Sequence, residues 1–350
     1  MSINKRTTIF TSVIISSVLL SGCGLLGSEK KEEIDPPKTV TYTDDGTVTE
    51  GSVAEEGVDQ EVAEETIGTE LYLFDKNGYV VPQTLELPKT ESVAKQAIEY
   101  LVQDGPVTEL LPNGFAAVLP ADTEVNINVK DKTAIVNFSN EFKNYKPEDE
   151  LKILQAVTWT LTQFDSIENV KLQLNGHDLN EMPVAGTPIG ASISRVNGIN
   201  IDTSDVVDIT NTEAATVYYV AGDEGAYYYV PVTRRVEEND IEGLVAELVK
   251  GPSYNSPLIN DFAPDVALLD EPKIEDGKVT LNFNESIYGS FEEKIISEHV
   301  LNSLVLSLTE QKGIESVEVM VNGKADLVRE NGEKLAEPVT RPENVNTGSF

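Results

Sequence analysis

One segment of this chain occurs twice, and the duplication constrains the fold more than any other feature. Residues 135–142 (IVNFSNEF) recur at 280–287 (TLNFNESI), with their Asn residues 282 − 137 = 145 positions apart. Residues 167–176 (IENVKLQLNG) recur at 314–323 (IESVEVMVNG), with their Asn residues 322 − 175 = 147 positions apart. Two nearly equal offsets over this distance predict a duplicated domain.

Hydrophobic periodicity predicts the same order of elements in both copies, β-β-α-β-β-α-β. In the first copy we expect strands at 70–74 and 79–81, a helix at 90–102, strands at 125–129 and 133–138, a helix at 147–163 and a strand at 167–174. In the second copy we expect strands at 216–220 and 227–230, a helix from about 241, strands at 272–274 and 279–283, a helix at 291–309 and a strand at 314–321. The predicted fold class is α+β, with two tandem domains, each a mixed sheet covered on one face by two helices.

Turn residues separate these elements. The first helix of each copy stops at Gly-Pro (105–106 and 251–252), where we expect a left-handed Gly cap and a Pro that prevents continuation. The closing strand of each copy ends at Asn-Gly (175–176 and 322–323), a strong signal for a tight turn. The second helices are expected to turn inward Leu151, Leu154, Val157, Thr158 and Leu161 in the first copy, and Ile296, Val300, Leu304 and Leu308 in the second.

The amino end has the pattern of a targeting segment. Two basic residues precede an apolar run over 9–20, which is shorter than the roughly 20 residues of a membrane-spanning helix. The run ends at Leu20, Ser21, Gly22 and Cys23, which resembles the bacterial lipobox. We therefore expect a signal peptide over 1–22 and lipid, diacylglycerol or palmitate, on Cys23. The alternative is an ordinary secretory signal with a chance cysteine.

Composition divides the remainder of the chain. Residues 24–68 hold 13 acidic residues and three lysines without any hydrophobic period, which predicts a disordered acidic tether. We accordingly expect the lipidated Cys and tether over 23–68, a first domain over 69–189, a connector over 190–214, a second domain over 215–340 and a loose tail over 341–350.

The charge of the chain excludes some partners. Its 60 acidic and 26 basic residues give a net charge of −34, a field that repels nucleic acid, so no nucleic-acid partner is expected. The single cysteine excludes an internal disulfide. Its expected lipidation leaves no thiol for catalysis or metal binding.

Nothing in the sequence indicates a catalytic centre, a cofactor or a metal. Neither His177 nor His299 has a His counterpart, because 177 + 147 = 324 and 299 − 147 = 152 are both Lys. Neither lies in a zinc-binding spacing, so each is interpreted as an ordinary surface or helix-flanking residue. The spacing Asp202, Asp205, Asp208 lacks the rhythm of a calcium loop.

Carboxylates are so abundant that a glycosidase-like pair could be nominated almost anywhere. The least arbitrary candidates follow the repeated Asn-Phe pair, namely Glu141, Glu148 and Asp149 in the first copy and Glu285 in the second. A solvated acidic loop explains them more simply. The tyrosines at 227–229 leave a similar choice, between a sugar-stacking platform and alternation on a half-buried strand.

The repeated Asn137-Phe138-Ser139 strand end, the helix after it and the closing strand ending in Asn-Gly resemble the GerMN domain of bacterial sporulation and germination proteins. Asn282-Phe283-Asn284 departs from that pattern at its third position. A lipobox followed by two such domains resembles the lipoproteins of this family in spore-forming bacteria. The resemblance covers roughly 69–340 plus the signal, and it implies an α+β domain related to ring-building modules of secretion systems.

The same resemblance implies a scaffold required for sporulation and germination, contributing to a ring or channel complex between mother cell and forespore. The chain would be held at the cell membrane by its lipid and face the extracytoplasmic space. Its partners would be proteins of that assembly, and self-association into a homo-oligomer stays open. The alternative, from a different class, is a peptidoglycan hydrolase that depends on one carboxylate. We favour assembly because Gly, Pro, Asn-Gly and apolar periodicity are what recur between the copies; whether the protein is an enzyme stays open.

Overall fold

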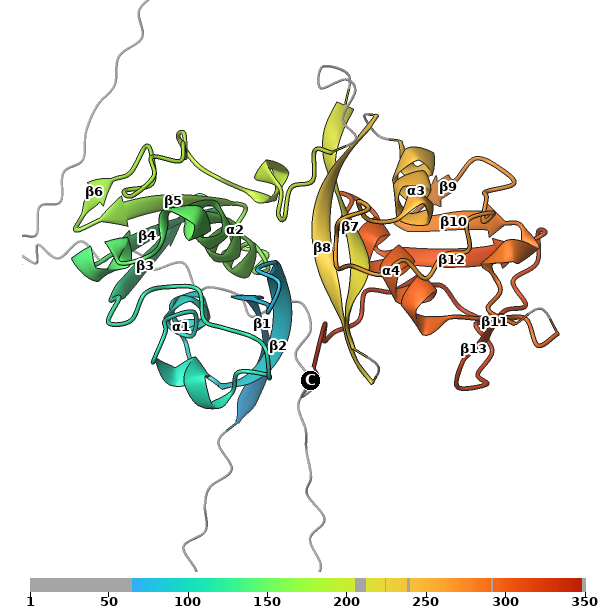
Figure 1. Cartoon of the computed structure of the whole chain (residues 1–350), viewed down its shortest axis with the longest axis horizontal. Helices are drawn as coiled ribbons and strands as arrows, with labels where there is room; N and C mark the ends of the chain where they lie inside the picture. The colour runs from blue at the N-terminus through green and yellow to red at the C-terminus, as the bar shows by residue number, and fades with distance from the viewer. Residues whose placement is uncertain (1–64, 205–211, 224, 238–239, 291, 348–350) are drawn as a thin grey trace, which may run out of the picture. The chain divides into compact units, whose positions relative to one another are not determined.

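The structure is a computed structural model that describes residues 65–204, 212–223, 225–237, 240–290 and 292–347 (Figure 1). The predicted signal peptide, the lipobox with Cys23 and nearly all of the predicted tether lie outside the described residues. Both repeats belong to one compact unit, 33–350.

The first repeat contains a hairpin, a four-stranded sheet and two α-helices. Its elements are β1 (Thr66–Phe74), β2 (Val80–Pro88), α1 (Val93–Glu99), η1 (Pro106–Glu109), β3 (Val125–Lys130), β4 (Thr133–Phe138), η2 (Asn140–Lys143), η3 (Pro147–Asp149), α2 (Glu150–Leu161), β5 (Asn169–Leu174) and β6 (His177–Asp178). The sheet has the order β3-β4-β5-β6, with β4 parallel to β5 and the other pairs antiparallel. The short 3-10 turn η4 (Arg195–Asn197) follows.

The second repeat has the same plan, with eight described strands in place of six. Its elements are β7 (Thr212–Asp223), β8 (Ala226–Glu237), α3 (Ile241–Lys250), β9 (Lys273–Glu275), β10 (Lys278–Phe283), η5 (Glu285–Ile287), β11 (Ile295–Ile296), α4 (Glu298–Thr309), β12 (Ser316–Val321), β13 (Val328–Arg329) and β14 (Val339–Thr340). The sheet order is β9-β10-β12-β14, with β10 parallel to β12. The α+β class and the predicted element order are therefore confirmed in both repeats.

The long helices α2 and α4 lie between two layers. In the sheet strands β4, β10 and β12 every second residue is buried, so one face of each sheet is packed and the other is polar. Helix α2 is buried continuously from Ile153 to Leu161 and α4 from Ser303 to Leu308. A helix buried on all sides must be covered on both sides. The sheet covers one side and the hairpin covers the other, since α2 contacts β1 and β5 while α4 contacts β7 and β12.

The hairpins are the main departure from the predicted architecture. The sequence predicted short first strands and a single sheet with helices on one face. The strands β1, β2, β7 and β8 are nine to twelve residues long, and each hairpin is a separate two-stranded sheet (Figure 1). Each is anchored to its helix by an equivalent hydrogen bond. The Tyr72 N–H donates to Thr160 Oγ1 (3.1 Å), and the Tyr218 N–H donates to Ser307 Oγ (2.8 Å).

The first helices end differently from the prediction. Helix α1 stops at Glu99 rather than near residue 102, because the N–H groups of Leu101 and Val102 donate only three residues back and the Gln103 N–H donates to the Leu119 carbonyl. The predicted left-handed glycine cap is confirmed at Gly251, which has φ +85° and closes α3. It is wrong at Gly105, whose φ is −91°.

The second helices begin later than predicted. In α2 the predicted inward residue Leu151 is 44 % exposed, because the neighbouring Glu150 turns inward to bind loop amides. In the second repeat, residues expected at the start of a helix instead form β11, which pairs in parallel with β13. Helix α4 starts only after Ser297, whose hydroxyl accepts from the His299 N–H. Ile296 is buried as predicted, but in a strand.

The predicted loose tail over 341–350 is wrong over its described part. Strand β14, within the range expected to close the second domain, pairs with β12, and Val345 beyond it is 2 % exposed. In the described part of the predicted connector, Ile193 bridges Val170 of β5. Both segments are fixed because they are the closing parts of the two repeats.

Candidate functional site at the junction of the repeats

Each repeat ends in a segment that binds the hairpin of the other repeat. The Ile199 N–H donates to Thr233 Oγ1 (2.8 Å), and the Thr233 N–H donates to the Ile199 carbonyl (2.9 Å). In the mirrored contact the Val345 N–H donates to Thr84 Oγ1 (2.9 Å), and the Thr84 N–H donates to the Val345 carbonyl (3.1 Å). The two contacts are equivalent, so the repeats exchange their closing segments.

The residue after each of these contacts is an asparagine that links strands β2 and β8. Asn200 accepts from the Val80 N–H and donates to the carbonyls of Val80 and Pro231. Asn346 accepts from the Tyr229 N–H and donates to the carbonyls of Tyr229 and Pro82. Both asparagines have positive φ, +45° and +57°, a backbone region that Asn enters more readily than most residues.

These contacts give the junction the local symmetry of a two-fold dimer interface within one chain. The residues responsible recur in the sequence, although the predicted domains and strands made no use of them. Val-Pro-x-Thr occurs at 81–84 and 230–233, and Arg-x-x-x-x-Asn occurs at 195–200 and 341–346. The offsets, 233 − 84 = 149 and 346 − 200 = 146, are close to those of the longer repeated segments, so the sequence carries a signal for these residues.

One carboxylate at this junction lies close to two arginines. Glu310, at the end of α4, binds Arg195 at 2.8 Å and is 3.0 Å from Arg341. It also accepts from the Tyr218 hydroxyl (2.9 Å). Arg341 in turn is 3.7 Å from Glu70 of β1. The two arginines are equivalent residues of the two repeats, so both closing segments are tied to a single side chain.

The electrostatics of Glu310 follow from this arrangement. Burial raises its pKa, but Arg195 and Arg341 outweigh burial and leave the pKa below the usual range. Burial together with the carboxylate raises the pKa of Tyr218. The carboxylate is therefore ionised and the phenol neutral at physiological pH. The Glu310 side chain is 8 % exposed, so its charge depends on its partners.

The only tryptophan in the chain supports the same cluster. Trp159 of α2 is 1 % exposed, and its indole N–H donates to the Gly198 carbonyl (3.3 Å). The Arg195 guanidinium lies 4.4 Å from the indole ring centroid, within the range of a cation–π interaction. The first closing segment is therefore held by packing and hydrogen bonds as well as by the ion pair.

A second buried carboxylate organises the loop after β6. Glu150 is 1 % exposed and accepts five hydrogen bonds, from Tyr145, Val184, Ala185 and the N–H and hydroxyl of Thr187. Burial raises its pKa, but these donors outweigh burial and lower it to about 2. The prediction from the sequence nominated its exposed neighbour Glu148 and missed Glu150.

The repeated motifs are hydrogen-bond partners of each other. Asn137 Oδ1 accepts from the Gly176 N–H (2.7 Å), and Asn282 Oδ1 accepts from the Gly323 N–H (2.8 Å). The Asn of Asn-Phe therefore closes the Asn-Gly turn of the neighbouring parallel strand. That turn needs positive φ at both of its residues, as found in both repeats.

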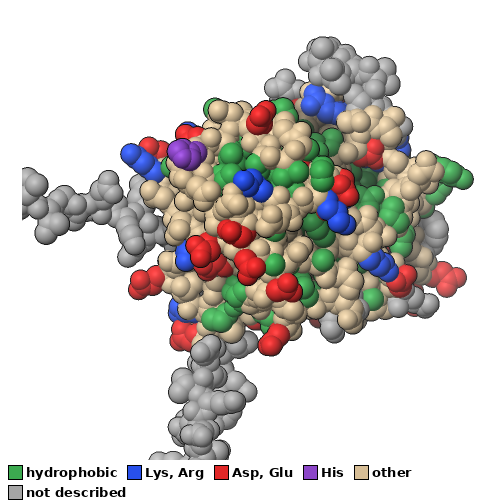
Figure 2. All heavy atoms as spheres, turned by 60° about the vertical axis from the view of Figure 1, so that its left-hand side comes forward, with side chains coloured by type: hydrophobic (Ala, Val, Ile, Leu, Met, Phe, Trp, Pro, Cys, Tyr) green, Lys and Arg blue, Asp and Glu red, His purple; other side chains and the backbone are tan. Residues whose placement is uncertain are grey.

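The nominated carboxylates lie at the surface or beside a turn. A hydrogen bond from Ser139 lowers the pKa of Glu141, whereas a general acid needs a raised pKa. Glu285 accepts from Asn322 Nδ2 (2.9 Å) beside the turn, and Glu148 is exposed while Asp149 is partly so. Several acidic side chains lie close together on the face shown in Figure 2.

The remaining predicted site residues are also placed. His177 is exposed on β6, and His299 Nδ1 lies 2.9 Å from Asp261. Asp202 accepts from Ser204 and is paired with Arg234, while Asp205 and Asp208 lie outside the described residues. The described ranges contain no group of three His, Cys, Asp or Glu side chains that could hold a metal ion. Within the same ranges, no helix combines the length and apolarity needed to cross a bilayer.

The two tandem α+β repeats and their pseudo-two-fold junction place the chain in the class of proteins built from a duplicated domain. A family model described as "Germane: Sporulation and spore germination" matches residues 70–180 and 216–326. The chain is 59 % identical to spore germination protein GerM of Bacillus subtilis over 96 % of both chains. It therefore belongs to the Germane family of sporulation and spore germination proteins, as the sequence motifs predicted.

A solved structure of both domains agrees with this assignment. The tandem GerMN domains of the sporulation protein GerM from Bacillus subtilis are 61 % identical, cover 81 % of this chain and all of that chain, and superpose with a TM-score of 0.75. The first GerMN domain of the same protein is 72 % identical, covers 37 % of this chain and 98 % of that chain, and gives a TM-score of 0.37.

Proposed function

We propose that this protein is a lipid-anchored scaffold of the cell envelope that contributes to a ring or channel assembly between mother cell and forespore. The observation that supports a scaffold is the junction. Exchanged closing segments and one shared core join the two repeats into one compact unit. Such a unit can present surfaces of both repeats to neighbouring subunits, as a subunit of a regular assembly must.

The repeated residues also favour assembly over catalysis. Asn137, Gly176 and their counterparts are engaged in the turn, and Thr84, Thr233 and the two junction asparagines are engaged between the repeats. These residues therefore support the framework rather than a reaction. The lipobox supports attachment of this unit to the membrane through Cys23.

The anchor is tested by Cys23→Ala in sporulating cells. We expect the variant to leave the membrane fraction and lose lipid labelling, whereas Gly22→Ala, which keeps a small residue before the cysteine, should stay membrane-bound. Membrane retention of Cys23→Ala after alkaline washing would refute the anchor.

The assembly role is tested by cross-linking the chain in sporulating cells and purifying it in detergent. We expect a complex much larger than 38.2 kDa that contains other envelope proteins and forms only during sporulation. A monomer under these conditions would contradict the scaffold. Specific release of muropeptides from peptidoglycan by the purified protein, lost in Glu141→Gln or Glu285→Gln, would establish the hydrolase instead.

A further inference from the structure

The two Val-Pro-x-Thr segments of the junction differ at one pair of positions. Position x is Gln83 in β2 and Val232 in β8, and both side chains are buried, at 0 % and 3 % exposed. Because Val232 is buried at the equivalent position of β8, an apolar side chain is compatible with the packing of the junction there. The amide of Gln83 is therefore not required to hold the repeats together.

Both polar atoms of the Gln83 side chain, Oε1 and Nε2, are buried without a hydrogen-bond partner among the described residues. Leaving such a group unpaired costs about as much as losing a hydrogen bond, so a donor and an acceptor from outside the fold are needed to satisfy it.

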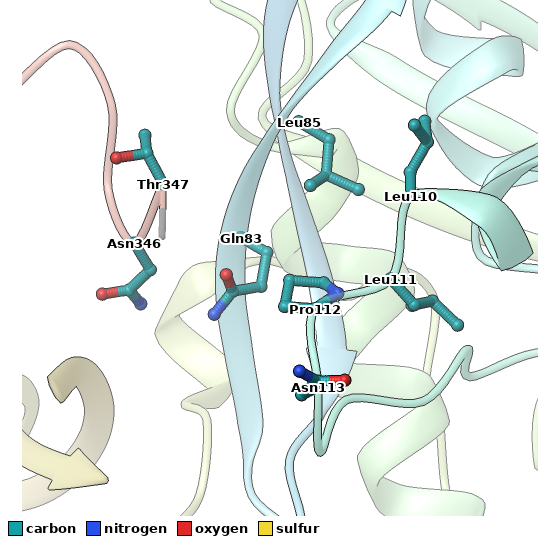
Figure 3. Close-up of a pocket in the computed structure, with 8 residues that line it drawn as sticks. All are labelled: Gln83, Leu85, Leu110, Leu111, Pro112, Asn113, Asn346 and Thr347. Carbon is teal, nitrogen blue, oxygen red and sulfur yellow. The ribbon is translucent and has the colours of Figure 1, made fainter. Parts of the chain in front are cut away.

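A pocket of about 240 Å³ lies beside this amide (Figure 3). Gln83 and Leu85 of β2 form one wall, Leu110, Leu111, Pro112 and Asn113 a second wall, and Asn346 and Thr347 a third. Leu110 is 42 % exposed and Asn113 is exposed, so the pocket opens to solvent on that side. Asn346 uses its amide within the junction, which leaves Gln83 as the buried polar group available to an occupant.

The second repeat has a charged side chain at one of the corresponding positions. The counterpart of Leu85 is Arg234 (234 − 85 = 149), which is 2 % exposed and paired with Asp202 at 3.3 Å. Its Nη2 donates to the Gly251 carbonyl (3.2 Å). The first repeat has an uncharged leucine there, and every residue lining its pocket is uncharged. In a chain with a net charge of −34, this lining disfavours an ionic ligand, because no counter-charge would replace the lost water.

We propose that the Gln83 pocket binds a main-chain amide of an uncharged peptide segment, with an aliphatic side chain of that segment against Leu85, Leu110 and Pro112. An amide offers one N–H donor and one carbonyl acceptor, which match Oε1 and Nε2 of Gln83. The three apolar residues supply the surface that an aliphatic side chain covers. This inference concerns a ligand site and stands independently of the anchor and of the scaffold.

Methyl NMR of the full-length chain in detergent, with labelled leucines, tests the site. N-(3-methylbutyl)acetamide is a probe with one amide and a leucine-like chain, and 3-methylbutyl acetate is its ester of the same shape without the N–H. We expect the amide to shift the methyl signals of Leu85, Leu110 and Leu111 with a dissociation constant on the order of 10 mM, and the ester to bind at least about threefold more weakly. Equal binding of amide and ester would overturn the role of Gln83.

Gln83→Val copies the second repeat, so it should fold normally and lose the preference for the amide. A blocked Ala-Leu-Ala-Ala peptide should bind at the same leucines more tightly than the probe. If neither the amide nor the peptide shifts the leucine signals of the natural, folded chain up to the solubility limit of each ligand, the pocket holds water only. That result would overturn the site. Binding of the small amide without binding of the peptide would overturn a peptide as the occupant.

Discussion

Gln163 and Glu310 occupy equivalent positions of the two repeats (310 − 163 = 147), and they make different contacts. Gln163 binds the main chain of Glu70 through both ends of its amide, so it closes its own repeat. Glu310 instead draws in Arg195 and Arg341 from the ends of both repeats. The duplication therefore gives both repeats the same junction geometry. The amide of Gln163 contacts only its own repeat, whereas the carboxylate of Glu310 contacts the closing segments of both repeats.

The largest effect is expected when this difference is removed. Glu310→Gln makes the second repeat resemble the first and leaves two partly buried arginines without their main counter-charge. We expect the free energy of unfolding to fall by about 3–5 kcal/mol, measured by urea unfolding at neutral pH.

The exposed pair of Lys132 and Glu168 gives the matched control. Glu168→Gln removes a carboxylate whose side chain is 60 % exposed, so the free energy of unfolding should change by about 1 kcal/mol or less. If both variants lose the same small amount, the charge cluster does not stabilise the junction, and Glu310 differs from Gln163 without consequence.

A second difference between the repeats lies at the start of their long helices. Glu150 of the first repeat corresponds to Ser297 of the second (297 − 150 = 147), and only Glu150 anchors a loop through its carboxylate. Its folded pKa of about 2 lies below the ordinary glutamate pKa of 4.5, so the stabilisation is complete above pH 4.5 and is lost as the pH falls toward 2. The loss should approach about 3 kcal/mol.

Hydrogen exchange at the amides of Val184, Ala185 and Thr187 measures this locally. Their protection should fall between pH 4.5 and 2 in the natural chain, and should be low at every pH in Glu150→Gln. Glu148→Gln, which changes the exposed carboxylate two positions earlier, should leave the amides protected. Unchanged protection at pH 2 in the natural chain would show that the carboxylate does not hold the loop.

The sequence predicted the parts of the fold that have a period, and missed the parts that do not. Alternation located strands β3, β4, β10 and β12, because half-buried strands repeat every two residues. The junction escaped because its contacts join residues far apart, such as Thr84 and Val345 (345 − 84 = 261), and polar pairs leave no periodic signal. The equal offset between the copies is the one signal in the sequence that marks Asn200 and Arg195.

The next effect is expected to be of similar size in both repeats. Thr160→Val and Ser307→Ala each remove the hydroxyl that accepts the strand N–H of Tyr72 or Tyr218. These strand amides are buried, so each variant should lose about 1–3 kcal/mol in the free energy of unfolding. Thr158→Val is the control, because its hydroxyl donates only within α2, to the Leu154 carbonyl, and no strand amide depends on it. A large loss in one repeat alone would show that the two hairpins are held differently.

The smallest effect tests whether the shared Asn-Phe motif is structural in both repeats. Asn137→Ala and Asn282→Ala each remove the side-chain oxygen that accepts from a turn glycine, Gly176 or Gly323. Both glycines are exposed, so water replaces the lost acceptor and each variant should lose only about 1 kcal/mol, seen as a small shift of the urea midpoint. Equal losses, with assembly in cells unchanged, mean that the motif maintains the turn and nothing else. If one variant keeps its stability but abolishes sporulation, that Asn contacts a partner, and the two repeats differ in function at the very residues they share.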